Sequence, residues 1–198
     1  MSDPDLLAAL APVLGVLRAL AVRHFVGGSI ASSAHGLARA SVDADVVAEL
    51  ALAQVAPFVA ALRDQYYLSE ERVRDAVVRK ASCNLIHLDT MLKVDLFVSR
   101  DRPFDRRAFE RSRPASIEGA GGATLPVSSA EDVVLAKLEW YRRGGEVSER
   151  QWSDVMGVLR AGRTALDRPY LLRGAVELEV GDLLARALDE AEAAGTDR

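Results

Sequence analysis

The sequence predicts an α/β fold, in which a mixed sheet flanked by helices is followed by a helical bundle. Two observations lead to this prediction. Short apolar segments of strand length alternate with amphipathic segments of helical period in the first part of the chain. From residue 128 onward, the apolar residues recur at helical spacing only. The 198 residues are therefore expected to form an α/β core over residues 1–127, with a helical C-terminal part over residues 128–198 packed on that core.

The individual elements follow from periodicity and from turn and cap residues. Helices are expected at residues 5–21, 29–35, 51–63 and 103–111, and residues 70–79 are either helical or irregular. Strands are expected at residues 24–26, 42–50, 66–68, 84–88 and 93–98, and the last two form a hairpin. Two short β segments follow around the glycines at positions 119, 121 and 122. The C-terminal helices are expected at about 128–142, 148–161, 167–178 and 180–194.

Composition narrows the class of protein. Cys83 is the one cysteine, so no internal disulfide can form, and a reducing compartment fits. The first residues are acidic where an export signal would be basic, and no apolar run reaches membrane-spanning length. We therefore expect a cytoplasmic protein without a membrane partner. The formal net charge of −4 argues against a global attraction to nucleic acid.

One segment of the chain is locally rich in basic residues, although the net charge is negative. Six arginines lie between positions 100 and 113, interspersed with three acidic residues. The arginines are Arg100, Arg102, Arg106, Arg107, Arg111 and Arg113. They form either a solvated helix face with mixed ion pairs or a rim that contacts a polyanion, and the sequence leaves both interpretations open.

Three aspartates on two predicted strands are the candidate metal ligands. Asp43 and Asp45 are two positions apart, so a strand places both side chains on one face, about 7 Å apart. Asp95 lies alone among apolar residues of a later strand. If the two strands pair, three carboxylates gather and can bridge two metal ions of the kind used for in-line phosphoryl or nucleotidyl transfer. The alternatives are a half-polar edge strand and an ion pair between Asp95 and Lys93.

A glycine turn precedes these strands. Gly27 and Gly28 follow an apolar strand, and Ser29 begins a short helix. Glycines let a phosphate approach the backbone closely, the helix N-terminus offers unpaired N–H groups, and a serine adds a hydroxyl donor. A plain tight turn is the alternative.

The order of these motifs resembles the DNA polymerase β-type nucleotidyltransferase superfamily. The segments VGGSIA at 26–31 and HGLARASVDAD at 35–45 are most similar to the abortive-infection and toxin–antitoxin nucleotidyltransferases. The segments SAEDVVLAKL at 129–138 and RQWSDV at 150–155 are similar to the helices after the core of those proteins. The resemblance extends over about residues 22–160, and Ala44 stands where a larger aliphatic residue is common.

The resemblance implies an enzyme that binds a nucleoside triphosphate on the glycine turn and two Mg²⁺ ions on the three aspartates. Asp43 and Asp45 would bind both ions, and Asp95 would bind the catalytic one and help to deprotonate the acceptor. The product is a nucleoside monophosphate joined to a hydroxyl of RNA, protein or a small molecule. The resemblance also makes Lys137 a candidate triphosphate contact, with a snorkelling lysine as the alternative. Arg39 is a further candidate, because it could reach a phosphate from its expected loop, and a surface salt bridge is the alternative.

Two further functional interpretations remain open. A non-catalytic nucleotide-binding or interaction protein, such as one member of a toxin–antitoxin pair with its partner, would keep the fold without turnover. An antibiotic nucleotidyltransferase would share the chemistry and differ in the acceptor pocket. The histidines show no metal-ligand spacing, and His35 is expected to be structural. Trp140, Tyr141 and Trp152 are interpreted as helix packing, with base stacking as the alternative.

Overall fold

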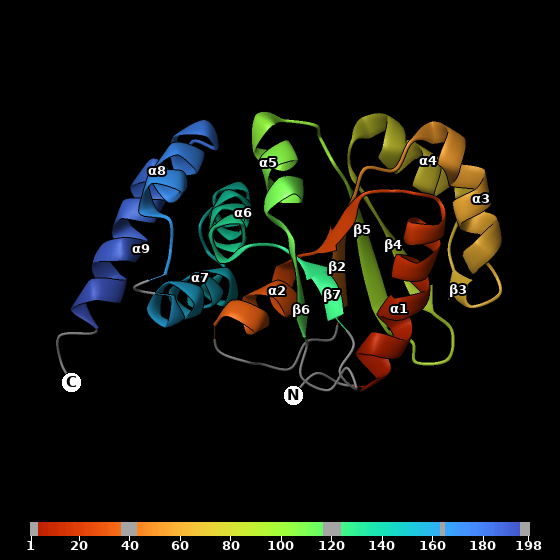
Figure 1. Ribbon diagram of the computed structural model, residues 1–198, viewed down its shortest axis with the longest axis horizontal. Helices are drawn as coiled ribbons and strands as arrows, with labels where there is room; N and C mark the ends of the chain where they lie inside the picture. Colours follow the sequence, from red (N-terminus) through yellow and green to blue (C-terminus); the bar gives the residue numbers. More distant parts are fainter. Residues whose placement is uncertain (1–3, 37–42, 117–123, 163–164, 195–198) are drawn as a thin grey trace. The chain divides into compact units, whose positions relative to one another are not determined.

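The structure is a computed structural model, and it describes residues 4–36, 43–116, 124–162 and 165–194. Over these residues the chain has a mixed α/β architecture with a seven-stranded mixed sheet, which confirms the predicted fold class (Figure 1). The chain divides into two compact units. The sheet unit comprises Met1–Ile30 and Arg39–Val127, and the helical unit comprises Ala31–Ala38 and Ser128–Arg198.

The strand order in the sheet is β3-β4-β5-β2-β1-β7-β6. The pairs β2–β5 and β1–β7 are parallel, and the other neighbouring pairs are antiparallel. The strands are β1 His24–Val26, β2 Asp43–Ala48, β3 Tyr66–Tyr67, β4 Ser82–His87, β5 Lys93–Val98, β6 Arg113–Ser116 and β7 Thr124–Val127. This order puts β2 and β5 side by side near the middle of the sheet. In the sequence they are separated by α3, β3, α4 and β4.

Three helices cover one face of the sheet. Helix α1 packs on β2 and β5, α4 packs on β4 and β5, and α3 lies against α1 and α4 (Figure 1). The helices are α1 Pro4–Ala19, α3 Leu52–Leu62 and α4 Glu70–Arg79. Beneath them Ala44, Val46 and Leu96 are fully buried, because alternation turns every second side chain of each strand toward this layer. The burial of this apolar row holds β2 and β5 in register.

Helix α5, Pro103–Arg111, covers part of the opposite face. Its residues Ala108 and Phe109 pack on Phe25 of β1 and Val47 of β2. The rings of Phe25 and Phe109 meet edge to face, with centroids 4.9 Å apart. Because Val47 shares its strand face with Asp43 and Asp45, α5 lies on the carboxylate face of the sheet.

The helical unit contains four successive helices in the part of the chain described after residue 127. They are α6 Ala130–Arg143, α7 Glu149–Ala161, α8 Arg168–Glu177 and α9 Gly181–Ala193. Serine or aspartate side chains cap the first three at their N-termini. Gly174 lets α8 approach α6 closely, since a Cβ atom there would lie 2.4 Å from Leu135 Cδ1. His35, near the end of α2 (Gly28–His35), shares a hydrogen bond of 2.7 Å with the Ser128 carbonyl, which fits a structural histidine.

Several boundaries differ from the sequence prediction. Residues 70–79 form a regular helix that Ser69 caps. Strand β4 begins two residues earlier than predicted, because Ser82 pairs with Phe97. The helix predicted to reach residue 21 ends at Ala19, and Ala21 has a φ of 53°. The glycines at 119, 121 and 122 lie outside the described residues, between β6 and β7. Among the helices that the structure describes, none is both long and apolar enough to cross a membrane.

Candidate active site

Parallel pairing of β2 with β5 brings the predicted carboxylates onto one surface. Asp45 lies directly opposite Asp95, and Asp43 lies opposite Lys93. Asp43 and Asp45 are two positions apart on β2, so all three carboxylates lie on the sheet face that α1, α3 and α4 leave uncovered. The side chains of Asp43 and Asp95 are 28% and 18% exposed, so both are accessible to solvent.

Lys93 joins two of these carboxylates. Its Nζ atom lies 2.8 Å from Asp95 Oδ2 and 4.0 Å from Asp43 Oδ2. The hydrogen bond to Asp95 raises the pKa of the Lys93 ammonium, burial offsets part of this effect, and the negative charges of the three aspartates add to the rise. The ion pair that the sequence offered as an alternative for Asp95 is therefore present, and it extends to Asp43. The contact between Lys93 and Asp95 could be expected from the sequence, because residues two positions apart in a strand lie on the same face.

The glycine turn lies against the carboxylate of Asp45. Gly28 has a φ of +55°, and a Cβ atom on it would lie 1.6 Å from Asp45 Oδ2. The Gly27 amide donates a hydrogen bond of 2.9 Å to the Asp45 carbonyl oxygen. A side chain at position 28 is thus excluded both by the backbone conformation and by the carboxylate. The turn and the β2 carboxylates form one continuous surface, with the buried hydroxyl residue Ser29 directly after it.

The donor set suits a hard divalent cation, because carboxylate oxygens are the ligands that Mg²⁺ prefers. As the side chains stand in the described ranges, however, no group of three or more His, Cys, Asp or Glu residues surrounds a common point. Asp43 and Asp45 are separated by one strand repeat, and Asp43 and Asp95 contact the Lys93 ammonium. A metal ion would have to draw the carboxylates together and replace that ammonium.

The other predicted triphosphate contacts are not part of this surface as described. Arg39 lies outside the described residues. Lys137 belongs to the helical unit, where it is 6% exposed. Its Nζ atom lies 2.7 Å from Asp154 Oδ2 and donates a hydrogen bond of 3.2 Å to Gln151 Oε1. The interpretation of Lys137 as a snorkelling lysine is therefore wrong, because a buried carboxylate holds its ammonium inside the unit.

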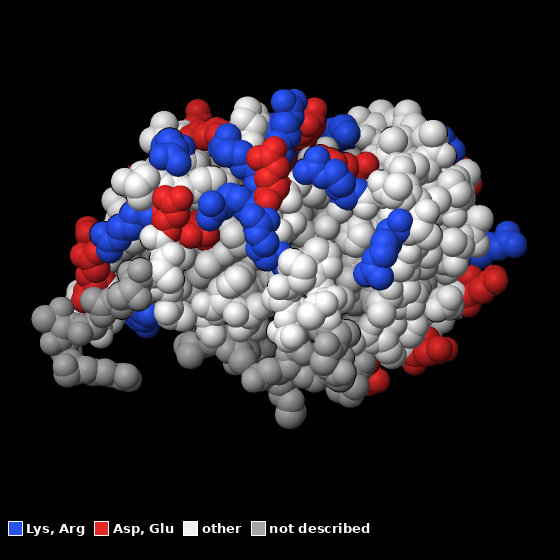
Figure 2. All heavy atoms as spheres, viewed as in Figure 1, with Lys and Arg blue, Asp and Glu red and all other residues white. Residues whose placement is uncertain are grey.

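Arginines of the basic stretch at 100–113 form ion pairs with neighbouring aspartates. Arg106 Nε lies 2.7 Å from Asp101 Oδ1, and Arg102 Nη2 lies 2.8 Å from Asp105 Oδ1. The hydrogen bond from Arg106 holds the pKa of Asp101 below its usual value. Figure 2 shows basic and acidic side chains interspersed over the upper part of the face drawn there. These contacts agree with a solvated face of mixed charge.

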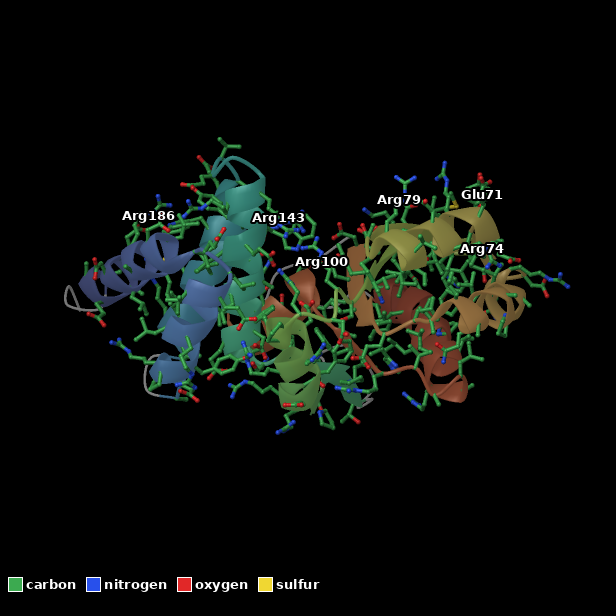
Figure 3. The ribbon with its side chains drawn as sticks, turned by 90° about the horizontal axis from the view of Figure 1, so that it is seen from above. Glu71, Arg74, Arg79, Arg100, Arg143 and Arg186 are labelled. Atoms are coloured by element: carbon green, nitrogen blue, oxygen red, sulfur yellow. The ribbon has the colours of Figure 1, made fainter. Side chains whose placement is uncertain are left out.

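The aromatic residues of the helical unit differ from one another. Trp140 is 45% exposed, so it is not a core residue. Tyr141 and Trp152 do pack, with ring centroids 5.3 Å apart. Arg186 of α9, labelled in Figure 3, lies over the Trp152 ring, and its Cζ atom is 3.8 Å from the ring centroid. The guanidinium covers one face of the Trp152 ring, a contact that sequence spacing alone did not indicate.

Comparisons with known proteins bear on the fold. No family model matches the sequence. A search of curated proteins gives no match either. Among solved structures, the chain is similar to an antigenic nucleotidyltransferase-like protein from Paracoccidioides brasiliensis, with 15% identity over 93% of each chain and a TM-score of 0.53. The chain therefore has a nucleotidyltransferase-like fold.

Two antibiotic-resistance proteins give weaker similarities. The lincosamide antibiotic adenylyltransferase LnuA, bound to lincomycin, is 12% identical, with 75% of this chain and 93% of that chain covered and a TM-score of 0.47. The antibiotic-resistance factor ANT(2'')-Ia is 12% identical, with 99% and 100% covered and a TM-score of 0.46. At these scores neither contributes to the functional argument.

Proposed function

We propose that this protein is a metal-dependent nucleotidyltransferase, which moves a nucleoside monophosphate from a nucleoside triphosphate to a hydroxyl group. One observation carries the proposal. Asp45 and Asp95 face each other across two paired strands, Asp43 lies on the same face, and the Asp45 carboxylate touches the Gly28 turn. Nucleotidyl transfer needs acidic ligands beside a backbone that phosphates can approach, and this surface offers both.

Each residue has a defined task in this proposal. Asp43, Asp45 and Asp95 would hold two Mg²⁺ ions, which supply charge neutralisation at the triphosphate and an activated acceptor hydroxyl. Asp95 would accept the proton of that hydroxyl, a role that the sequence resemblance implies and that its partial exposure to solvent permits. The Gly27–Gly28 turn and the amide groups at the start of α2 receive the triphosphate, and Ser29 adds a hydroxyl donor.

Lys137 and Arg39 are further triphosphate contacts in this proposal, Lys137 from the sequence resemblance and Arg39 from its place in the sequence shortly before Asp43. For Lys137, contact with a triphosphate requires its ammonium to exchange the Asp154 carboxylate for a phosphate oxygen. The acceptor is RNA, protein or a small molecule, and a role in a toxin–antitoxin pair in the cytoplasm belongs to the same proposal. The competing function is nucleotide binding without transfer.

Incubation with radiolabelled triphosphates tests the proposal. Each of the four triphosphates, labelled at the α-phosphate, is supplied with Mg²⁺ and a cell extract. We expect one or more to label an acceptor, and nuclease or protease digestion then identifies the acceptor class. The label should disappear with a chelator and with Asp95→Asn. Mg²⁺-dependent triphosphate binding without any label would support the non-catalytic alternative, and the absence of binding would contradict both.

A further inference from the structure

Lys93 occupies an unusual position for a basic residue in a site that should attract cations. It begins β5, directly opposite Asp43 and two residues before Asp95. Its ammonium contacts an oxygen of each carboxylate, at 4.0 Å and 2.8 Å. The contacts come from neighbouring strands, so the ammonium lies between β2 and β5 on the carboxylate face. A metal ion shared by these two side chains would have to take the same space.

We propose that Lys93 is a tethered counter-cation, which occupies the place between Asp43 and Asp95 until a divalent metal replaces it. The ammonium keeps two carboxylates of adjacent strands together when no metal is bound. On metal binding it leaves this place, and its competition sets the metal affinity of the site. This inference rests on the proposed function, and it makes Lys93 a positioning residue that contributes no ligand to the metal.

Two features of Lys93 support an exchange over a permanent ion pair. The side chain is 41% exposed, so its flexible stem can move the ammonium into water without opening the core. An ammonium and a divalent cation held about 4 Å apart also repel each other, by enough to change a binding constant at least tenfold even in a water-like medium. A surface ion pair remote from the carboxylates would have no such effect on metal binding and would contribute little to stability.

Metal titration of the full-length protein tests the exchange directly. Isothermal titration calorimetry with Mg²⁺, and thermal unfolding with and without Mg²⁺, are compared for the wild type and Lys93→Met. We expect the variant to bind Mg²⁺ about tenfold more tightly, because the competing charge is gone. We also expect a lower unfolding temperature than the wild type without metal and a larger rise when metal is added. Lys93→Arg keeps the charge and should restore the weaker affinity.

The chain offers a matched control, because the sequence has three lysines and Lys80 is exposed at the end of α4. Lys80→Met should bind Mg²⁺ like the wild type, and Asp95→Asn should bind Mg²⁺ more weakly than the wild type. Lys93→Gln, neutral and more polar, repeats the test if the methionine variant aggregates.

The outcomes separate this inference from the function on which it rests. Equal or weaker Mg²⁺ binding by Lys93→Met, with clear binding by the wild type, would overturn the exchange and leave the metal-dependent function in place. No Mg²⁺ binding by any variant, with or without triphosphate, would overturn both.

Discussion

Replacing Gly28 with alanine should damage the site and the stability of the sheet unit together. The added methyl group meets two obstacles. The φ of +55° is a left-handed conformation, which a non-glycine residue adopts at a cost of about 1–2 kcal/mol. The new Cβ atom would also lie 1.6 Å from Asp45 Oδ2, where ordinary contacts begin at 3.4 Å. The Asp45 carboxylate must therefore turn away from the glycine turn.

The expected magnitude follows from these two terms. Turning Asp45 out of its position adds about 0.5–1.5 kcal/mol if the side chain leaves its preferred rotamer. A total loss of about 2 kcal/mol would lower the unfolding temperature of a chain of this length by about 4–8 °C. A displacement of about 1 Å at a metal ligand should reduce nucleotidyl transfer by about 100-fold.

The adjacent glycine provides the control for the stability effect. Among the residues that the structure describes, an alanine at position 27 would meet only Val47 Cγ2 within 4 Å, at 3.9 Å, and its φ is not in the left-handed range. Gly27→Ala should therefore change the free energy of unfolding by less than about 0.5 kcal/mol. Differential scanning fluorimetry and the labelled-triphosphate assay measure the two effects. If Gly28→Ala unfolds and transfers like the wild type, the contact between Gly28 and Asp45 does not shape the site.

Three further predictions concern single side chains. Asp95→Asn should lower nucleotidyl transfer at least 100-fold and leave the triphosphate Kd within a few-fold, because Asp43 and Asp45 would still hold the nucleotide-bound ion. Equal turnover by the variant would remove Asp95 from the mechanism. Lys137→Met should lower the free energy of unfolding, measured in urea, by about 3–5 kcal/mol, because it leaves the Asp154 charge buried without its partner ammonium. The double variant with Asp154→Leu should recover most of this loss. A single variant as stable as the wild type would contradict the prediction. Burial, with a smaller contribution from Asp95, raises the pKa of Cys83 to about 11, so native protein at pH 8 should react slowly with iodoacetamide and faster as the pH nears 11. Rapid labelling of the native protein at pH 8 would refute this last expectation.

The local features of the site could be predicted because they depend on short-range geometry. Alternation along one strand places Asp43 and Asp45 on the same face whatever the strand pairs with. Consecutive glycines after an apolar strand indicate a sharp turn, and Gly28 does have a positive φ. The helical period after residue 127 predicted four helices there, and the described residues contain α6 to α9.

The contacts between distant segments could not be predicted from the same patterns. Asp45 and Asp95 meet because β2 and β5 bury Ala44, Val46 and Leu96 under the same helical layer, which fixes a parallel register across 44 intervening residues of chain. Asp154, the partner of Lys137, and Arg186, which covers Trp152, likewise come from other helices. Helical periodicity identifies a buried face without saying which side chain of another helix will meet it.

The sequence by itself therefore determined the fold class, the order of the elements and the residues able to carry metal chemistry. Tertiary structure decided how those residues meet. It placed the Lys93 ammonium between two carboxylates, pressed the Asp45 carboxylate against Gly28, and buried Lys137 with Asp154. The physical reason is that strand alternation and helical period act within one element, whereas strand register and charge pairing depend on how apolar faces from separate elements are buried together.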